Sequence, residues 1–516
     1  MPKKAAILSF IQQPAFVFVV VLAAFFIHYN YANILPLRPQ GTHQWRQTDC
    51  TSLALNYYQD GNAFFEPTVH NQLGGTGKAV GEFPIIYYII AQFYHLFGPH
   101  ELIFRAFNLF LFFLGLFALF KLSHDFLEDR TWSIFSTFLI FTAPIIVFYV
   151  NNFLPDAPAL GLVFLGWYFF FRFYRDQKQL WFLIAMAFFM IAGLIKVTAA
   201  MSFVVMGAIY VFEVLGIMKF KKEGRVYEKP LLQLVPFALV LISIVSWYLY
   251  ALHYNELNET GYFSTQTRPI YILTETHIAQ IIAMIKMKWR YQYFDQFTLL
   301  FLGLALVGNI LLWKRVHPIF KLAIPLFICG IAVYGLLWFQ AFDHHDYYLI
   351  NLYVLPAILL ISLFSAIKKS YPGLFGSWGL KMVFILFLIY NISYASSELK
   401  RRYNPEVTKT YNANYFTLAS YLDSIGIDRS KRVINTFDAS PNISLYLMNR
   451  DGWTNINNLT DSTKVHRIIT LGADYIIVGD TVEQKMPHLN PFLTEKVGDY
   501  RGIEIFKVPD WARPAN

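Results

Sequence analysis

The sequence has few charged residues and almost no cysteine, and both shortages restrict what the chain can be. Only 15% of its 516 residues are Asp, Glu, Lys or Arg, whereas soluble globular chains carry about a quarter. Two cysteines, Cys50 and Cys329, cannot form a disulfide framework. An ordinary soluble domain and a disulfide-rich secreted scaffold are therefore both excluded.

Hydrophobic residues make up 56% of the chain, and the mean hydropathy is +0.42. A bilayer span needs about 20 apolar residues, and the sequence contains eleven runs of suitable length. We therefore predict a polytopic α-helical membrane protein. The runs are 14–33, 101–120, 132–151, 157–174, 180–196, 197–217, 231–252, 297–313, 317–338, 347–367 and 378–397.

A twelfth apolar segment, 83–97, is shorter and contains Gln92 and His95. Lysine and arginine gather on the cytoplasmic side of membrane proteins. If 83–97 does not cross, all six basic groups fall on that side; if it crosses, five of them move outside. We therefore predict an interfacial or re-entrant helix there, with the N-terminus cytoplasmic. The groups are Lys3–Lys4, 121–130, 172–178, 219–225, Lys314–Arg315 and Lys368–Lys369.

This topology gives a transmembrane domain, 1–399, with a first outer loop at 34–100. Charges are scarce inside the spans, whereas ion-driven transporters usually place ionisable groups there. The pattern favours a rigid bundle that holds a site at one interface.

Composition changes near residue 400. Strand patterns occur at 432–437, 473–479 and 503–508, and a helical pattern at 465–471 ends at Gly472. We predict a small extracytoplasmic α/β domain, 400–516, without a phosphate-binding signature. A packing or acceptor-docking module explains it without catalytic residues.

The polar stretch His-Gln-Trp-Arg-Gln-Thr-Asp-Cys, 43–50, lies on the outer face by this topology. Thr42 can cap a helix that ends near Asp60. Arg46 and Asp49 are three residues apart and share a helix face, which keeps the carboxylate ionised. Such a carboxylate can act as a base, although an ordinary surface ion pair explains the pattern as well.

Two further carboxylates fall on the same face of the membrane. Glu82 precedes the segment 83–97, where it can also merely complement the helix dipole. Asp156 lies in Asn-Asn-Phe-Leu-Pro-Asp-Ala-Pro, 151–158, where it suits a helix N-cap. Together with Asp49, three carboxylates then lie at one membrane interface, and this combination suggests a site.

Basic and histidine side chains accompany them. Lys196, between two spans, either snorkels to the interface or neutralises a phosphate. The motif Asp-His-His-Asp-Tyr-Tyr, 343–348, places His344, His345 and Tyr347 where they can bind a sugar or phosphate, or a metal. The identity of any metal stays unknown; a divalent cation is possible. Arg290 lies in the outer loop 253–296, which can close over a ligand.

These motifs, taken in order over residues 10–400, resemble the type-C glycosyltransferases. More narrowly, they resemble the branch that contains protein O-mannosyltransferases and the lipid A aminoarabinose transferase. The motifs are the first-loop Asp, the Glu-x-Pro at 82–84, the Asp-Ala-Pro at 156–158 and the Gly-Leu-x-Lys at 193–196. The resemblance implies a lipid-phosphate sugar donor, an inverting transfer and an extracytoplasmic site.

Carried over by the resemblance, Asp49 is the catalytic base, and Glu82 and Asp156 are the other acidic site residues. One departure concerns the phosphate. The aminoarabinose branch has Glu-Lys-Pro, whose lysine contacts the donor phosphate, whereas this chain has Phe83. The cationic candidates for the phosphate are then Arg46, Lys78, Lys196 and Arg290.

We therefore predict a bacterial inner-membrane glycosyltransferase that moves a sugar from a polyprenyl phosphate to a glycan, lipid or protein acceptor, with no nucleic-acid partner. A polyprenyl carrier can deliver a sugar to the outer face, where nucleotide sugars are not supplied. A glycan ligase or polymerase with a longer lipid-linked donor is one alternative. A non-catalytic lipid-glycan transporter or assembly partner is the other.

Overall fold

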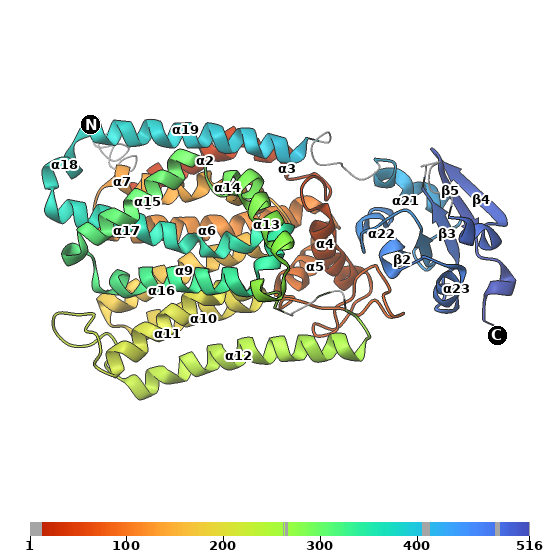
Figure 1. Ribbon diagram of the computed structural model, residues 1–516, viewed down its shortest axis with the longest axis horizontal. Coiled ribbons are helices and arrows are strands. Elements are labelled where there is room, and N and C mark those ends of the chain that lie inside the picture. Colours follow the sequence, from red (N-terminus) through yellow and green to blue (C-terminus); the bar gives the residue numbers. More distant parts are fainter. Residues whose placement is uncertain (1–12, 262, 264–266, 405–412, 480–485, 515–516) are drawn as a thin grey trace. The chain divides into compact units, whose positions relative to one another are not determined.

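The computed structural model describes residues 13–261, 263, 267–404, 413–479 and 486–514 (Figure 1). It divides into two compact units. Unit 1 comprises 1–36, 104–248 and 266–401, and unit 2 comprises 37–103, 249–265 and 402–516. The predicted boundary near residue 400 separated the tail from everything before it. The structure instead groups the first outer loop with the tail.

Unit 1 is a bundle of helices, and each of the eleven predicted runs is helical in it. Figure 1 shows α6, α9, α10, α16 and α17 running side by side. The bounds are α2 (Pro14–His28), α3 (Tyr31–Ile34), α6 (Glu101–Leu127), α7 (Arg130–Phe138), α8 (Pro144–Val150), α9 (Asp156–Asp176), α10 (Gln179–Ile195), α11 (Ala200–Val214), α12 (Pro230–Leu257), α13 (Glu275–Met284), α14 (Arg290–Tyr293), α15 (Gln296–Leu311), α16 (Pro318–Leu337), α17 (Val354–Ser370), α18 (Pro372–Gly376) and α19 (Trp378–Tyr403).

Seven helices of the described chain are long and apolar enough to cross a bilayer, or eight if the bent pair Glu275–Tyr293 and Gln296–Leu311 is one span. The remaining predicted runs are shorter or broken. The run 132–151 is interrupted between α7 and α8 because Pro144 disfavours a helical conformation at the residue before it. The chain is thus a multi-pass membrane protein.

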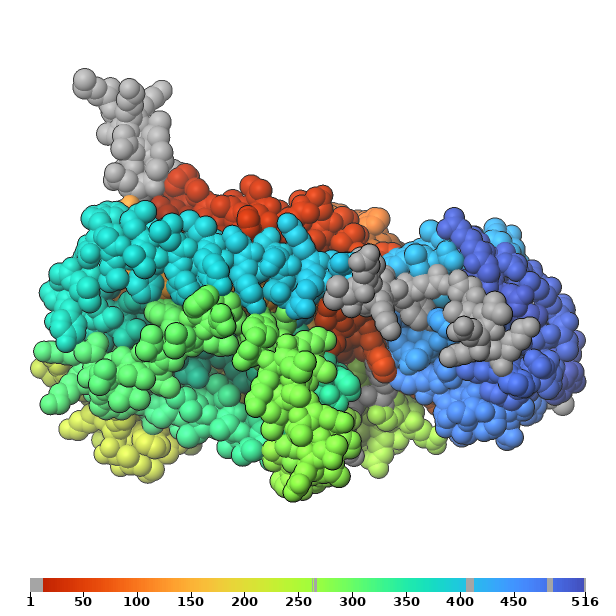
Figure 2. All heavy atoms as spheres, turned by 45° about the horizontal axis from the view of Figure 1, so that its top comes forward, coloured from red at the N-terminus to blue at the C-terminus, as the bar shows by residue number. Residues whose placement is uncertain are grey.

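The outside of unit 1 is apolar, as a bilayer requires. Figure 2 shows α19, in cyan, on the outer surface, where Val383, Leu386 and Ile389 are exposed. Inside the bundle, α6 and α9 touch backbone to backbone. A Cβ at Gly115 would lie 2.2 Å from the carbonyl oxygen of Gly161, so the crossing depends on small residues, as is common between membrane helices.

Unit 2 combines two helices of the first loop, α4 (Gln44–Gln59) and α5 (Ile85–Phe97), with the C-terminal domain. At 13 residues, α5 is too short to span a bilayer, and its interfacial position remains a prediction. Thr42 does not cap α4. His43 holds that position in a left-handed conformation with φ +55°.

The C-terminal domain is a small α/β fold, as predicted. Its mixed sheet has the strand order β2-β1-β3-β5-β4, with β2 and β3 parallel to β1 and the β3–β5 and β5–β4 pairs antiparallel. The bounds are α21 (Tyr415–Ser424), β1 (Val433–Asn435), α22 (Ile443–Met448), β2 (Gly452–Thr454), α23 (Ser462–Thr470), β3 (Tyr475–Val478), β4 (Glu495–Tyr500) and β5 (Ile503–Lys507).

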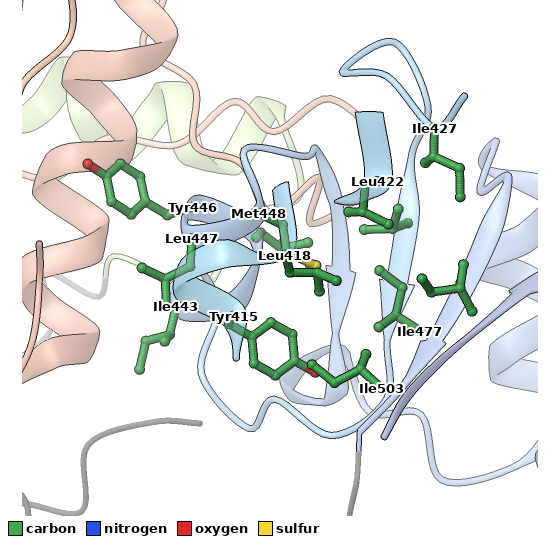
Figure 3. Packing of buried hydrophobic residues seen from close by; sticks show 13 residues of the cluster. Tyr415, Leu418, Leu422, Ile427, Ile443, Tyr446, Leu447, Met448, Ile477 and Ile503 are labelled. Carbon is green, nitrogen blue, oxygen red and sulfur yellow. The ribbon is translucent and has the colours of Figure 1, made fainter. Parts of the chain in front are cut away.

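The domain core packs α21 and α22 against the sheet. Leu418, Leu422 and Ile477 are fully buried in it (Figure 3). Tyr446, which also belongs to this cluster, lies at its side nearest the helices of the first loop (Figure 3). Its hydroxyl donates to Glu101 Oε1 at 3.2 Å. Within unit 2, the domain is therefore tied to the first residue of α6.

Candidate active site

Helix α4 carries an unusual number of buried polar side chains. Gln47, Thr48 and Asp49 are at most 1% exposed. Gln47 Nε2 donates to the carbonyl oxygens of Gln40 and Thr42, at 2.8 and 2.9 Å, and so holds the chain that enters the helix. Buried polar groups need partners, and here they fix the start of α4.

Arg46 joins two of the predicted carboxylates. Its Nη1 lies 3.8 Å from Asp49 Oδ2, and its Nη2 pairs with Glu82 Oε1. The guanidinium also lies 5.6 Å from the ring centre of Phe263. The hydroxyl of Tyr87, on α5, donates to Glu82 Oε1. The predicted Arg46–Asp49 pair is therefore part of a larger cluster that includes Glu82.

Burial and neighbouring charges act in opposite directions on the pKa of Arg46. Burial alone lowers the pKa of Arg46, but nearby Glu82, Cys50, Tyr87 and Asp49 raise it well above its ordinary value. Burial raises the pKa of the Cys50 thiol to about 12. A neutral thiol is a poor nucleophile, so Cys50 is a poor candidate for a nucleophile in this cluster.

The second oxygen of Asp49 faces the C-terminal domain. Asn442 Nδ2, just before α22, donates to Asp49 Oδ1 at 2.9 Å. Asn442 itself is fully buried. Sequence reasoning missed this contact because the two residues are 393 positions apart, and an isolated asparagine before a short helix carries no recognisable signal.

Unit 1 holds a second cluster, built around Asp156 and Lys196. Asp156 is the first residue of α9, and Lys196 lies at the break that follows α10. Lys196 Nζ is 2.9 Å from Asp156 Oδ1, and the two side chains are 13% and 1% exposed. Lys196 also faces the rings of Tyr347 and Tyr348, at 5.2 and 5.0 Å. The structure thus gives Lys196 a buried partner rather than a snorkelling position.

The loop before Asp156 is held by α6. Arg105 Nη1 donates to the carbonyl oxygen of Asn151 at 2.6 Å and lies 4.1 Å from the ring centre of Phe153. Asn108 Nδ2 donates to the carbonyl oxygen of Asn152 at 2.9 Å. These buried contacts fix the backbone that presents Asp156 to Lys196.

The histidines of the 343–348 motif differ in their surroundings. His345 Nδ1 lies 3.1 Å from the Tyr347 hydroxyl, whereas the side chain of His344 is 78% exposed beside Asp343. Asp346 is buried and accepts a hydrogen bond from Tyr149 at 2.8 Å. Within the described residues, no group of three or more His, Cys, Asp or Glu side chains could hold a metal ion.

Two further predicted phosphate-binding residues have other partners. Lys78 pairs with Glu66 at 3.0 Å on the surface of unit 2. Arg290 lies on α14 against Tyr291. Phe83, which replaces the expected lysine, packs against Phe64 with ring centres 5.2 Å apart. The structure therefore brings Arg46 to Asp49 and Glu82, and Lys196 to Asp156.

Comparison with known families gives one match, over residues 81–258, to the family model described as dolichyl-phosphate-mannose-protein mannosyltransferase. The matched segment begins at Gly81, beside Glu82, and includes Asp156 and Lys196. No curated protein sequence matches the chain.

Two solved structures share the fold. The first is ArnT from Cupriavidus metallidurans in the apo state, with a TM-score of 0.59 at 11% identity. The second is ArnT from the same organism bound to undecaprenyl phosphate, with a TM-score of 0.57 at 11% identity. Each match covers 97% of this chain and 99% of the other. The resemblance predicted from the sequence is confirmed: residues 81–258 match the dolichyl-phosphate-mannose-protein mannosyltransferase family, and the chain has the ArnT fold.

Proposed function

We propose that this protein is a membrane glycosyltransferase that moves a sugar from a polyprenyl-phosphate donor to an acceptor outside the cytoplasm. The observation that carries the proposal is the Arg46 cluster, in which one partly buried guanidinium faces both Asp49 and Glu82. The family match over 81–258 and the ArnT fold support it. So does the undecaprenyl phosphate bound in the second ArnT structure.

In this proposal Asp49 is the general base. Its carboxylate takes the proton from an acceptor hydroxyl or amine as the oxygen or nitrogen bonds to the anomeric carbon. The bond between that carbon and the phosphate oxygen breaks, and its electron pair leaves with the polyprenyl phosphate. Attack opposite the leaving group inverts the anomeric carbon. Arg46 keeps Asp49 ionised because a neighbouring cation favours the charged carboxylate.

The leaving phosphate needs positive charge more than it needs a proton. Cations placed where negative charge develops stabilise the transition state. Arg46, in the same unit as Asp49, is our first candidate for this role, with Glu82 holding its guanidinium in place. Lys196, which Asp156 holds at 2.9 Å, belongs to a separate cluster in unit 1 that also offers a cation. Tyr347, whose ring faces Lys196, and His345, whose Nδ1 lies 3.1 Å from the Tyr347 hydroxyl, can bind the sugar or the phosphate.

We further propose that the protein lies in the bacterial inner membrane, with its N-terminus in the cytoplasm and the C-terminal domain outside. The six basic groups of the sequence support this orientation. The acceptor is a glycan, a lipid or a protein of the cell envelope.

The test is mass spectrometry of a reaction that contains purified protein in detergent, a panel of polyprenyl-phosphate sugars and a cell-envelope extract. We expect a product that gains one sugar mass. Asp49→Asn keeps the shape of the side chain but removes the base, and we expect turnover to fall by at least about a hundredfold, the lower end of what a general base contributes.

The matched control is Asp499→Asn, which removes an exposed carboxylate paired with Lys496 and should leave turnover unchanged. Wild-type turnover by a folded Asp49→Asn protein would refute Asp49 as the base. Transfer of a long preassembled glycan instead of one sugar would indicate a ligase.

A further inference from the structure

The orientation of the Asn442 amide is fixed by its two partners. The backbone N–H of Asn71 donates to Asn442 Oδ1 at 3.0 Å. Because a backbone N–H can only donate, the amide oxygen faces Asn71 and the amide nitrogen faces Asp49. Asn442 therefore donates to Asp49 Oδ1 at 2.9 Å, while Arg46 faces the other oxygen of the same carboxylate.

Asn442 is held by a rigid turn. Asp438 accepts from the backbone N–H groups of Ser440 and Ser444, at 2.8 and 2.7 Å. The hydroxyl of Ser440 accepts from the backbone N–H of Ile443 at 3.0 Å. Asp438 and Ser440 are both buried. A side chain in such a turn can fix the direction of the carboxylate that it contacts.

The first loop is joined to the edge of the domain sheet. Asn71 forms a parallel bridge with Gly452, the first residue of β2. The N–H of Gly452 donates to the carbonyl oxygen of His70 at 3.0 Å, and the N–H of Gln72 donates to that of Gly452 at 2.7 Å. Backbone pairing of this kind adds a short strand to an exposed sheet edge. It sets the distance between Asn442 and α4.

We propose that Asn442 is a positioning residue for Asp49, through which the C-terminal domain takes part in the transfer reaction. This inference rests on the proposed function. A hydrogen bond donated to an ionised carboxylate stabilises the charged form and fixes which oxygen lone pairs remain for the acceptor. The domain is then part of the active site rather than only a packing or docking module.

The decisive variant is Asn442→Asp. It keeps the shape of the side chain and an acceptor for the Asn71 N–H, but it removes the donor and sets a second carboxylate beside Asp49. We expect kcat to fall at least tenfold, with the KM for the lipid donor unchanged.

The acidic limb of the pH–rate profile should also move to higher pH, because Asp49 loses a donor and gains a like charge. The other titratable groups around Asp49 are Arg46 and Cys50 on α4, with Glu82 and Tyr87 beside them. The variant changes none of these side chains.

The matched control is Asn457→Asp, in the same domain. Asn457 Oδ1 accepts from Asn71 Nδ2 at 2.9 Å and from the Thr454 N–H at 3.0 Å, and an aspartate keeps both bonds. This control adds the same charge near the same junction, away from Asp49. We expect its kcat and its pH–rate profile to match the wild type.

A stability cycle tests the contact without relying on turnover. Asn442→Asp alone should lower the unfolding temperature, because it opposes two buried carboxylates. Asp49→Asn added to it restores a donor and an acceptor at this position and should recover most of the loss. Such recovery measures the coupling between the two residues.

An Asn442→Asp protein with wild-type kcat and an unshifted pH–rate profile would overturn the inference. An equal loss of turnover in Asn457→Asp would overturn it too, because the domain would then act only through packing. A wild-type protein that transfers no sugar would overturn the proposed function instead, whereas the recovery in the stability cycle would still be expected.

Discussion

Arg46 shows which contacts of a side chain can be predicted from the sequence and which cannot. Its spacing from Asp49 places both residues on one helix face, and the structure confirms the pair. Its second contact, with Glu82, crosses 36 positions. The resemblance named both carboxylates but not the guanidinium that joins them. A contact within one helix can be predicted from residue spacing, whereas an ion pair between distant segments depends on how the segments pack.

Lys196, in unit 1, is a second residue whose position could be predicted but whose partner could not. The sequence placed it at a junction between two spans, and it lies there. From the sequence, its ammonium could either snorkel to the interface or neutralise a phosphate. The structure pairs it with the buried carboxylate of Asp156, and an unpaired buried carboxylate is costly. No sequence pattern near Lys196 or Asp156 predicts that the two residues pair.

The buried carboxyl group of Asp451 makes the stability of the fold depend on pH. Burial raises the pKa of its carboxyl from 3.8 to about 6, with Arg429 opposing the shift and Asp60 adding to it. Its folded-state pKa therefore exceeds the unfolded value. The stability that Asp451 contributes is full below about pH 4 and is lost as the pH rises through about 6.

We predict that Asp451→Asn removes this loss, because an amide stays neutral. At pH 7 the variant should be more stable than the wild type by at most about 3 kcal/mol. Thermal unfolding of both proteins between pH 4 and 8 measures the difference. Two curves that remain parallel over this range would contradict the prediction.

At the scale of elements, the helices were more predictable than their ends. Every apolar run is helical, because a chain in lipid must satisfy its backbone hydrogen bonds within itself. Lengths and breaks were harder. A hydropathy profile does not show that Pro144 divides one run into α7 and α8. The helix predicted at 465–471 begins earlier, at Ser462, because the Asp461 side chain caps α23. In the tail, β2 and β4 were missed, since a three-residue strand and an exposed edge strand have little hydrophobic pattern.

The crossing of α6 and α9 yields a prediction at this scale. A Cβ at Gly115 would lie 2.2 Å from the carbonyl oxygen of Gly161, so Gly115→Ala must push the two helices apart. We expect a destabilisation of about 1–3 kcal/mol, the usual result of overpacking, seen as a lower unfolding temperature in detergent.

The control is Gly207→Ala on α11, where an added Cβ meets nothing within 4 Å. Alanine also has the higher helix propensity, so this variant should be as stable as the wild type or slightly more stable. Equal unfolding temperatures for Gly115→Ala and Gly207→Ala would show that the close approach is not needed.

For the whole molecule, the distribution of basic residues predicts that the N-terminus lies in the cytoplasm and the C-terminal domain outside it. With Cys50 and Cys329 replaced by alanine, a single cysteine can report each side. We expect Thr463→Cys, in the C-terminal domain, to react with a membrane-impermeant maleimide added to spheroplasts. Lys222→Cys should react only in inverted vesicles. Both positions are exposed, so access depends on the membrane alone, and the reverse labelling would invert the topology.

The pairing of the first loop with the edge of β2 also bears on the order in which the chain is made. Asn442 leaves the ribosome 371 residues after Asn71 and 393 residues after Asp49. Until that later part of the chain is made, Asp49 lacks its contact with Asn442. Contacts this distant in sequence form slowly. The surroundings of the candidate base are therefore completed late, so an unfinished chain carries an incomplete candidate site.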